Sequence, residues 1–314
     1  MIKVVFFGTP KIAINSIMKL LNFADIHFVA VVTQPDRPAG RGKKLVAPPV
    51  KECALKNGIP VFHTDSIRKD KELIEKLKEL EPDFFITFAF GQLLSQEVLD
   101  IPKVATINLH ASLLPKYRGA NPIQRCIYNG DSETGICTMI TELGLDTGDV
   151  CCSEKIKITE NMTNLELSEI ISEKSPFLLY KTLKGLMSGA VVPQKQDEKN
   201  VTIANKFKKE DGLINWNLES RQIHNQVRSM VDWPCAYTTF DEKIIKIIET
   251  RLIETLDTEG FEPGQVVSVS KNGIEVKTLD GSLLVTKVKP ESKGIMGSRD
   301  WANGVKLQKG ASFI

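Results

Sequence analysis

The sequence contains no apolar run close to the ~20 residues that a membrane-spanning helix needs. Its first residues, MIKVVFFGTP, are interrupted by Gly8 and Pro10 too early for a signal peptide. These two absences argue against a membrane protein and a secreted protein, so we expect a cytoplasmic protein without a membrane partner. The opening residues are better interpreted as a first buried strand.

Cysteine is scarce and is not arranged for metal binding. None of the six cysteines forms a C-x-x-C pair, and none lies near a histidine at a zinc-ligand spacing. We therefore expect buried, reduced thiols and no metal. Internal repeats and low-complexity tracts are also absent, which excludes a repeat architecture.

What is present is typical of a globular protein. The 314 residues are 42% apolar and 25% charged, and domains usually contain ~100–200 residues, so two domains are expected. The net charge of +2 identifies no partner, but basic residues gather in a loop between Gln34 and Pro49 that is long for a βα connection. They include Arg37, Arg41, Lys43 and Lys44. Such a loop either contacts a polyanion or stays solvated, and composition leaves both open.

The first half of the chain alternates strand and helix patterns. Nearly all-apolar strands are predicted at Ile2–Phe7, Phe28–Thr33, Ile59–Phe62, Asp83–Phe90 and Val104–His110. One helix is expected to start at Pro10, and another to be capped by Asp65 or Ser66. Buried strands separated by helices indicate an α/β fold with a doubly wound, mostly parallel sheet.

The second half has a different pattern. Pro176 lies inside the helical stretch Asn164–Met187, which is therefore expected to kink or split. A helix near Leu218–Val231 precedes five short strands with Asn-Gly and Asp-Gly turns, which suggests a smaller OB-like β-barrel. The predicted organisation is a first domain over residues 1–190, a linker over 191–205 and a C-terminal domain over 206–314.

Three polar residues are candidates for catalysis at the carboxyl edge of the sheet, where open α/β sheets bind their ligands. Asn108 and His110 share one face at the end of a strand, while Leu109 points into the packing. Asp146 lies between Gly144 and Gly148 in a loop that can turn tightly toward His110. Each of the three also has a purely structural interpretation: Asn108 can cap a turn, His110 can be a hydrogen-bonded structural histidine, and Asp146 can be a turn residue.

A resemblance to a known family sharpens this prediction. Asn108-Leu109-His110-Ala111-Ser112-Leu113-Leu114-Pro115 with Arg118-Gly119, and Leu145-Asp146-Thr147-Gly148-Asp149, closely resemble the two motifs of formyltransferases that use 10-formyltetrahydrofolate. The similarity is closest to the methionyl-tRNA formyltransferases and spans essentially the whole chain. Lys116-Tyr117 departs from it, because the family more often has Arg-Trp there.

The resemblance implies a function and assigns roles to residues. The formyl group of 10-formyltetrahydrofolate, the co-substrate, would be transferred to the α-amino group of methionine on initiator methionyl-tRNA. Asn108 would donate to the oxyanion, while His110 and Asp146 would share the proton transfer. The basic loop residues would contact the tRNA, with the C-terminal barrel holding its backbone, and the protein is expected to be a monomer. The expected folate pocket consists of Phe88, Ala89, Phe90, Gly91, Ser112, Leu113, Leu114 and Pro115.

Three alternatives stay open at this point. An amino-sugar formyltransferase would share the three polar residues, but it does not need a long basic loop. A dinucleotide-dependent oxidoreductase would share the doubly wound sheet, but Gly8-Thr9-Pro10 is not a G-x-G-x-x-G motif. A tRNA-binding protein without catalytic activity would leave Asn108, His110 and Asp146 unexplained.

Overall fold

The structure is a computed structural model that describes residues 1–39, 42, 44–254 and 258–314. Contacts divide the chain into two units. The first unit contains Met1–Gly119, Thr134–Ile156 and Ser168–Ile203, and the second contains Ala120–Glu133, Lys157–Leu167 and Ala204–Ile314. The domain boundaries predicted from the sequence, 1–190, 191–205 and 206–314, differ from these units and stay a prediction. No helix among the described residues is long and apolar enough to cross a membrane.

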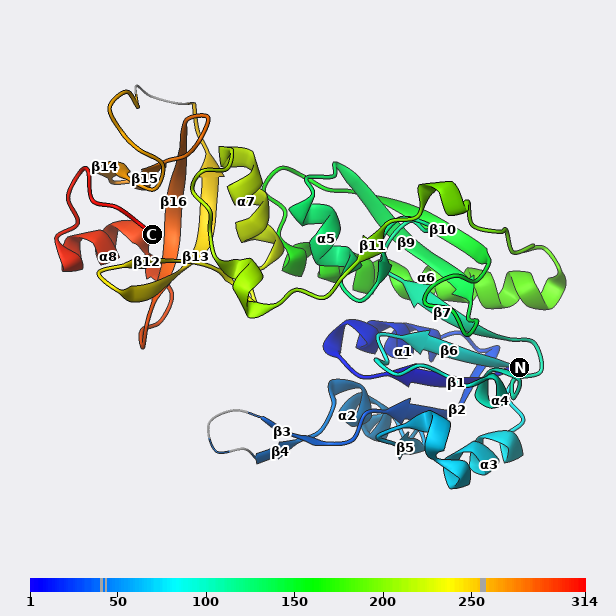
Figure 1. The fold of residues 1–314 in the computed structure, drawn as a ribbon. Coiled ribbons are helices and arrows are strands. Elements are labelled where there is room, and N and C mark those ends of the chain that lie inside the picture. Colours follow the sequence, from blue (N-terminus) through cyan, green and yellow to red (C-terminus); the bar gives the residue numbers. More distant parts are fainter. Residues whose placement is uncertain (40–41, 43, 255–257) are drawn as a thin grey trace. The chain divides into compact units, whose positions relative to one another are not determined.

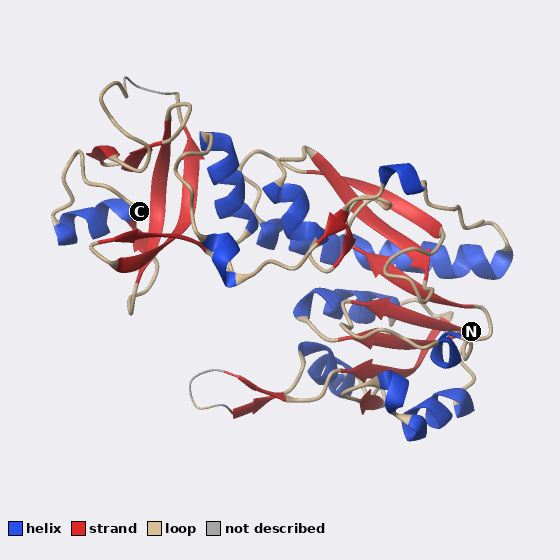
Figure 2. Cartoon of the chain, viewed as in Figure 1, coloured by secondary structure: helices blue, strands red, loops and turns tan. Residues whose placement is uncertain are grey.

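The first unit is built on a seven-stranded sheet with the strand order β10-β9-β7-β6-β1-β2-β5 (Figures 1 and 2). The four neighbouring pairs from β7 to β5 are parallel, and β9 runs antiparallel to β7. This confirms the predicted doubly wound, mostly parallel sheet. The strands are β1 (Ile2–Gly8), β2 (Ile26–Thr33), β5 (Val61–His63), β6 (Phe84–Phe88), β7 (Ala105–His110), β9 (Glu133–Ile140) and β10 (Val150–Lys157).

Helices cover both faces of this sheet. The chain winds from β1 to β2 to β5 and then returns to β6, so right-handed crossovers place the helices before and after the return on opposite faces. Val5 and Phe7 pack on one face with Leu73, Ile74 and Leu77 of α3. The helices of the α/β part are α1 (Ile14–Leu20), α2 (Pro49–Lys56), α3 (Lys71–Glu79), α4 (Gln96–Leu99) and α6 (Asn164–Ser188).

The start of α3 differs from the prediction. Asp70 caps this helix, because its Oδ1 accepts a hydrogen bond from the backbone N–H of Leu73 at 3.1 Å. Neither Asp65 nor Ser66 does so, since a 3₁₀ turn over Ile67–Lys69 comes first. The N–H of Ile67 donates instead to Oε1 of Gln92, at 2.8 Å. A side chain distant in sequence therefore takes the amide that a local cap was expected to bind.

Helix α6 is continuous through Pro176, so the expectation of a split is wrong, while the expectation of a kink stays a prediction. A proline inside a helix leaves the carbonyl four residues earlier without its usual donor. That carbonyl belongs to Ser172, and Nδ2 of Asn15 in α1 donates to it at 2.9 Å. The lost backbone hydrogen bond is thus replaced by a side chain from another helix.

The second unit contains a six-stranded sheet in which β12-β13-β16-β15-β14 are neighbours and β17 pairs with β16. The neighbouring strands of this sheet pair antiparallel, and the predicted Asn-Gly and Asp-Gly turn signals lie where β14 turns into β15 and where β15 turns into β16. The strands are β12 (Ala236–Phe240), β13 (Lys243–Leu252), β14 (Val266–Ser270), β15 (Gly273–Lys277), β16 (Ser282–Pro290) and β17 (Met296–Gly297). The remaining pairs are β3 (Arg37–Ala39) with β4 (Lys44–Val46), and β8 (Arg118–Gly119) with β11 (Ile203–Ala204).

The C-terminal residues bring the two edge strands of this sheet together. The N–H of Phe313 donates to the carbonyl of Gly264 beside β14, at 2.9 Å, and Ile314 exchanges two backbone hydrogen bonds with Thr239 of β12. This closure gives the sheet the barrel form predicted from the sequence. Trp216, Trp301 and Phe313 lie in its core. The helices of this unit are α5 (Pro122–Tyr128), α7 (Ser220–Ser229) and α8 (Ser298–Val305).

Helix α7 carries a buried histidine that is fully hydrogen-bonded. Nε2 of His224 lies 3.1 Å from the carbonyl oxygen of Glu160, which can only accept, so Nε2 carries the hydrogen. Nδ1 lies 2.9 Å from the hydroxyl of Thr250, which then donates to it. Burial is the main cause that lowers the pKa of His224, because it disfavours the charged imidazolium.

Candidate active site

Asn108 lies at the carboxyl end of β7, where the sheet is open to ligands. Thr87 of the neighbouring strand β6 pairs with it, and the Thr87 hydroxyl donates to Oδ1 of Asn108 at 2.8 Å. This bond orients the carboxamide, so that its NH₂ group remains available as a hydrogen-bond donor. Among the described residues that NH₂ group has no hydrogen-bond partner. Asn108 therefore presents a fixed donor at the edge of the sheet.

His110 is buried two residues further along the same face of β7. Its Nε2 lies 2.8 Å from the carbonyl oxygen of Tyr117. Because a carbonyl only accepts, Nε2 must donate, and the imidazole nitrogen that can gain or lose a proton is Nδ1. Nδ1 lies 3.6 Å from Oδ2 of Asp146, which is too long for a hydrogen bond but close enough for a charge interaction when the imidazole is protonated.

Asp146 reaches this position through a strained loop. Its φ is +55°, a left-handed conformation that non-glycine residues rarely adopt. Its Oδ2 accepts a hydrogen bond from the N–H of Gly119 at 2.8 Å, which fixes the carboxylate. A Cβ on Gly148 would lie 1.8 Å from the carbonyl oxygen of Ile140. Glycine is therefore required at position 148 by close backbone packing.

The structure places the predicted folate residues in two segments. In the first, the rings of Phe88 and Phe90 are buried, and Phe90 packs edge-on against Phe7 in the core at 5.3 Å. Between and after them, Ala89 and Gly91 are exposed and both have positive φ values. The rings of this segment therefore serve the core, while its exposed part is largely backbone.

The second segment turns sharply after β7. Ser112 is buried, and its hydroxyl donates to the carbonyl of Lys116 at 2.6 Å. Leu113, Leu114 and Pro115 are partly exposed, and the peptide bond between Leu114 and Pro115 is cis. This turn brings the Tyr117 carbonyl back to His110. The segment therefore holds His110 in place and is also a candidate wall of the folate pocket.

Two of the four basic loop residues are described, and they lie on a hairpin of β3 and β4. Arg37 forms an ion pair with Asp65 at 2.8 Å, and both side chains are mostly exposed. Lys44 is exposed on β4, where it faces Ala39. Arg41 and Lys43 lie outside the described residues. The two described basic residues thus lie on the hairpin, and neither Arg37 nor Lys44 serves the core.

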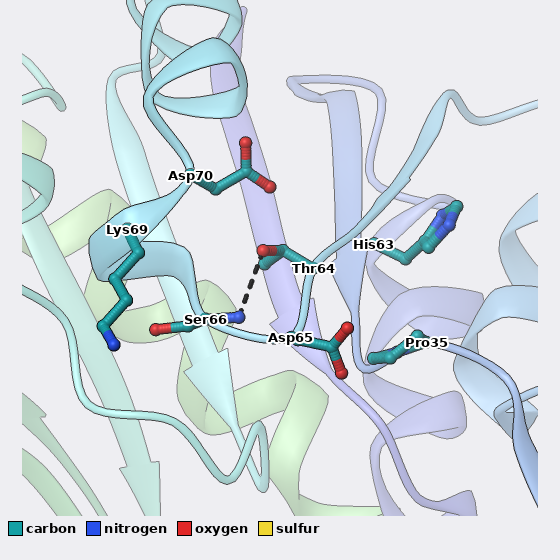
Figure 3. A pocket seen from close by; sticks show the side chains of 7 residues that line it. All are labelled: Pro35, His63, Thr64, Asp65, Ser66, Lys69 and Asp70. Carbon is teal, nitrogen blue, oxygen red and sulfur yellow. Dashed lines mark hydrogen bonds between the residues drawn. The ribbon is translucent and has the colours of Figure 1, made fainter.

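A shallow pocket of about 460 Å³ lies apart from the three polar candidates, at the end of β5 (Figure 3). The N–H of Ser66 donates to the Thr64 hydroxyl within it, at 3.2 Å. None of the predicted site residues lines it, although Arg37 pairs with Asp65 of its lining. The lining residues are Pro35, His63, Thr64, Asp65, Ser66, Lys69 and Asp70.

The cysteines and metal-binding residue types do not form a second centre. All six thiols are free, and all are buried except Cys151, which is partly exposed. Burial raises the pKa of Cys137, which faces His110 across the sheet, to about 12, so this thiol is protonated at neutral pH. Within the described ranges, no group of three or more His, Cys, Asp or Glu side chains is placed to hold a metal ion.

Three residues that hold the candidate site were not predicted from the sequence. Thr87 orients Asn108, the Tyr117 carbonyl fixes His110, and Gln196 donates to the Asp146 carbonyl at 2.8 Å. No local pattern marks them, because a threonine in a strand and a glutamine in an irregular segment are ordinary. Only the topology of the sheet, which places Thr87 beside Asn108, offers a signal.

Comparison with known proteins agrees with this geometry. The sequence profile of the formyl transferase family matches residues 2–183, and that of the formyl transferase C-terminal domain matches residues 206–306. HypX from Aquifex aeolicus in complex with tetrahydrofolic acid shares the fold, with a TM-score of 0.64, 16% identity, and 98% of this chain and 48% of that chain covered. Fold and profiles together define a formyltransferase.

Sequence similarity narrows the class. The methionyl-tRNA formyltransferase of Clostridium acetobutylicum is 46% identical over 310 residues, which cover 99% of each chain. That of Clostridium tetani is 45% identical over 310 residues, again 99% of each. The chain belongs to the family of methionyl-tRNA formyltransferases. This membership excludes the oxidoreductase and the tRNA-binding protein without catalytic activity.

Proposed function

We propose that this chain transfers the formyl group of 10-formyltetrahydrofolate to the α-amino group of methionine on initiator methionyl-tRNA. The observation that carries the proposal is the His110–Asp146 pair, 3.6 Å apart, beside the free donor of Asn108. Family membership supplies the substrate class. We further propose that the protein acts as a cytoplasmic monomer with tRNA and folate as its partners.

The residues present fit the folate co-substrate, which supplies an activated formyl group on its N10 nitrogen. Thr87 orients the carboxamide of Asn108 by donating to its Oδ1, and the NH₂ group of Asn108 has no partner among the described residues. Such a donor stabilises the oxyanion that develops when an amine attacks a formyl carbon, a role worth ~3–4 kcal/mol in comparable enzymes. Phe88–Gly91 and Ser112–Pro115 are the proposed walls of its pocket.

Proton transfer falls to Nδ1 of His110. The methionyl amino group has an ordinary pKa of ~7.7–8.0, so part of it is neutral and nucleophilic near pH 7. When its nitrogen bonds to the formyl carbon it must lose a proton, and N10 must gain one as the old C–N bond breaks. Nδ1 takes and returns this proton, because Nε2 is bound to Tyr117. The Asp146 carboxylate stabilises the imidazolium in between.

The basic hairpin supports tRNA as the acceptor. Arg37, Arg41, Lys43 and Lys44 are proposed to contact its phosphates, which position a nucleic acid without reading its sequence. Arg37 and Lys44 are exposed on β3 and β4 and are free of any core role. A nucleotide-linked amino sugar, the acceptor in the remaining alternative, has no comparable chain of phosphates to meet this loop.

The test compares acceptors. Purified protein is mixed with 10-formyltetrahydrofolate and either initiator methionyl-tRNA or a nucleotide-linked amino sugar, and the formylated product is measured by mass spectrometry. We expect formyl-methionine on the tRNA and no formylated sugar. Formylation of the sugar at the higher kcat/KM would replace this proposal with the amino-sugar reaction.

A further inference from the structure

The segment from Gln196 to Thr202, which was predicted to be part of a linker, binds the loop of Asp146. Nε2 of Gln196 donates both its hydrogens to that loop, to the carbonyl of Asp146 at 2.8 Å and to the carbonyl of Gly148 at 2.7 Å. Just before it, Gln194 exchanges two backbone hydrogen bonds of 2.8 Å with Val150. The segment is therefore joined to the first residue of β10 and clamps the catalytic loop through the carbonyls of Asp146 and Gly148.

Arg118 fixes the direction of the Gln196 carboxamide. Nε and Nη2 of Arg118 donate to Oε1 of Gln196 at 3.0 and 2.9 Å. Because a guanidinium only donates, Oε1 must face Arg118, and the NH₂ group must then face the two loop carbonyls. Arg118 itself is buried and forms an ion pair with Glu198 at 2.7 Å, which lowers the pKa of that carboxyl. The carboxamide is thus held in one orientation.

The same segment also supports the other member of the pair. The hydroxyl of Thr202 accepts a hydrogen bond from the N–H of Tyr117 at 2.8 Å, and the carbonyl of Thr202 accepts one from the N–H of Arg118 at 2.9 Å. Tyr117 has a φ of +62° and provides the carbonyl that binds Nε2 of His110. Residues 196–202 therefore hold the backbone behind both His110 and Asp146.

We propose that Gln196 is a positioning residue of the His110–Asp146 pair, an inference that rests on the proposed formyl transfer. The N–H of Gly119 holds the Asp146 carboxylate, but the backbone of Asp146 is left-handed, which non-glycine residues rarely adopt, so this backbone needs support from outside the loop. Gln196 gives this support through two hydrogen bonds to the carbonyls of the loop and touches no reacting atom. Its loss lets the loop relax and the carboxylate move away.

The test uses two substitutions and one matched control. Gln196→Met keeps the length of the side chain but removes both donors, and Gln196→Glu keeps the acceptor for Arg118 while removing the donors. A displacement of about 1 Å at a reacting group costs ~10²-fold in rate, so we expect both variants to lower kcat by that factor. KM for methionyl-tRNA should stay the same, because the loop carbonyls do not bind the acceptor. Gln194→Glu, whose side chain bonds only the Val192 carbonyl among the described residues, should behave as wild type.

A double variant separates positioning from general damage. If Gln196 acts through Asp146, adding Gln196→Met to Asp146→Asn should slow the reaction no further than Asp146→Asn alone. The proposal would be overturned if the rate losses of the two single variants multiplied in the double variant. It would also be overturned if the rate of Gln196→Met lay within threefold of wild type. A third result would also overturn the proposal: Gln196→Met lowers both kcat and the thermal unfolding temperature, while Gln196→Glu lowers neither.

Hydrogen exchange of residues 144–149 provides a readout that does not depend on activity. We expect faster exchange in both Gln196 variants than in wild type and Gln194→Glu. Unchanged exchange would overturn the inference even if the rate fell. Faster exchange together with a wild-type protein that forms no formyl-methionine would instead support the clamp and refute the proposed function, so the two failures are distinguishable.

Discussion

Asp146→Asn removes a negative charge 3.6 Å from Nδ1 of His110 while keeping the shape of the side chain. The asparagine oxygen can still accept the hydrogen bond from the N–H of Gly119. The substitution therefore separates two roles of Asp146, since the loop anchor survives and only the charge opposite the imidazole is lost.

The magnitude of the effect follows from this distance. Two unit charges about 4 Å apart interact by ~4 kcal/mol at the effective dielectric constant of ~20 that describes such sites. That energy corresponds to a rate factor of ~10³, because each 1.36 kcal/mol is tenfold. The interaction acts while His110 holds the transferred proton, so its loss raises the barrier of the proton-transfer step. We expect kcat to fall by ~10²–10³-fold, within the range for acid–base groups.

The assay is single-turnover formylation of initiator methionyl-tRNA with saturating 10-formyltetrahydrofolate. Asp149→Asn is the matched control, because it makes the same chemical change three residues along the same loop, and it should retain the wild-type rate. A rate for Asp146→Asn within tenfold of wild type would refute charge stabilisation by Asp146. Equal losses in both variants would refute it too, because they would show a general effect of charge in the loop.

Three further predictions follow from the structure. Gly148→Ala places a Cβ 1.8 Å from the carbonyl oxygen of Ile140, so the loop must shift, and stopped-flow formylation should be ~10²-fold slower; a wild-type rate would contradict this. Burial lowers the pKa of His224 below its unfolded value of ~6.5, so the unfolded state binds the proton first and the free energy of unfolding should fall as pH drops below ~6.5. Urea titrations at pH 5 and 7.5 should show this fall in wild type and a smaller one in His224→Gln, and equal falls would exclude the histidine as the cause. Arg41→Ala with Lys43→Ala should raise KM for methionyl-tRNA and flatten its logarithmic salt dependence by ~0.9 per phosphate contact, whereas unchanged values at two salt concentrations would mean that the loop is merely solvated.

The parts of the fold that follow from local pattern were predictable. The strands of the parallel sheet are nearly continuous apolar runs because both of their faces are buried, and the five predicted strands match β1, β2, β5, β6 and β7 within a few residues. The strands of the C-terminal sheet were bounded by turn residues with a defined backbone preference. The alternation of side chains along β7 also placed Asn108 and His110 on one face.

The parts that depend on distant contacts were not predictable. Asn15 keeps α6 continuous at Pro176, and Gln92 takes the amide that was expected to start a helix at Ser66. Both partners are far away in the sequence, so local propensity indicated neither the continuity of α6 nor the later start of α3. Gln196 illustrates the same limit at the site, because an irregular polar segment gives no indication that it will bind the Asp146 loop.

Proton transfer by His110 during formylation can be tested in a single comparison. Wild type and His110→Ala are compared in single-turnover formylation of initiator methionyl-tRNA from 10-formyltetrahydrofolate, with circular dichroism to show that both are folded. We predict formyl-methionyl-tRNA from wild type and a rate ~10²–10⁴-fold lower from the variant, the range for a general acid–base group. A folded His110→Ala protein within tenfold of the wild-type rate would contradict the account.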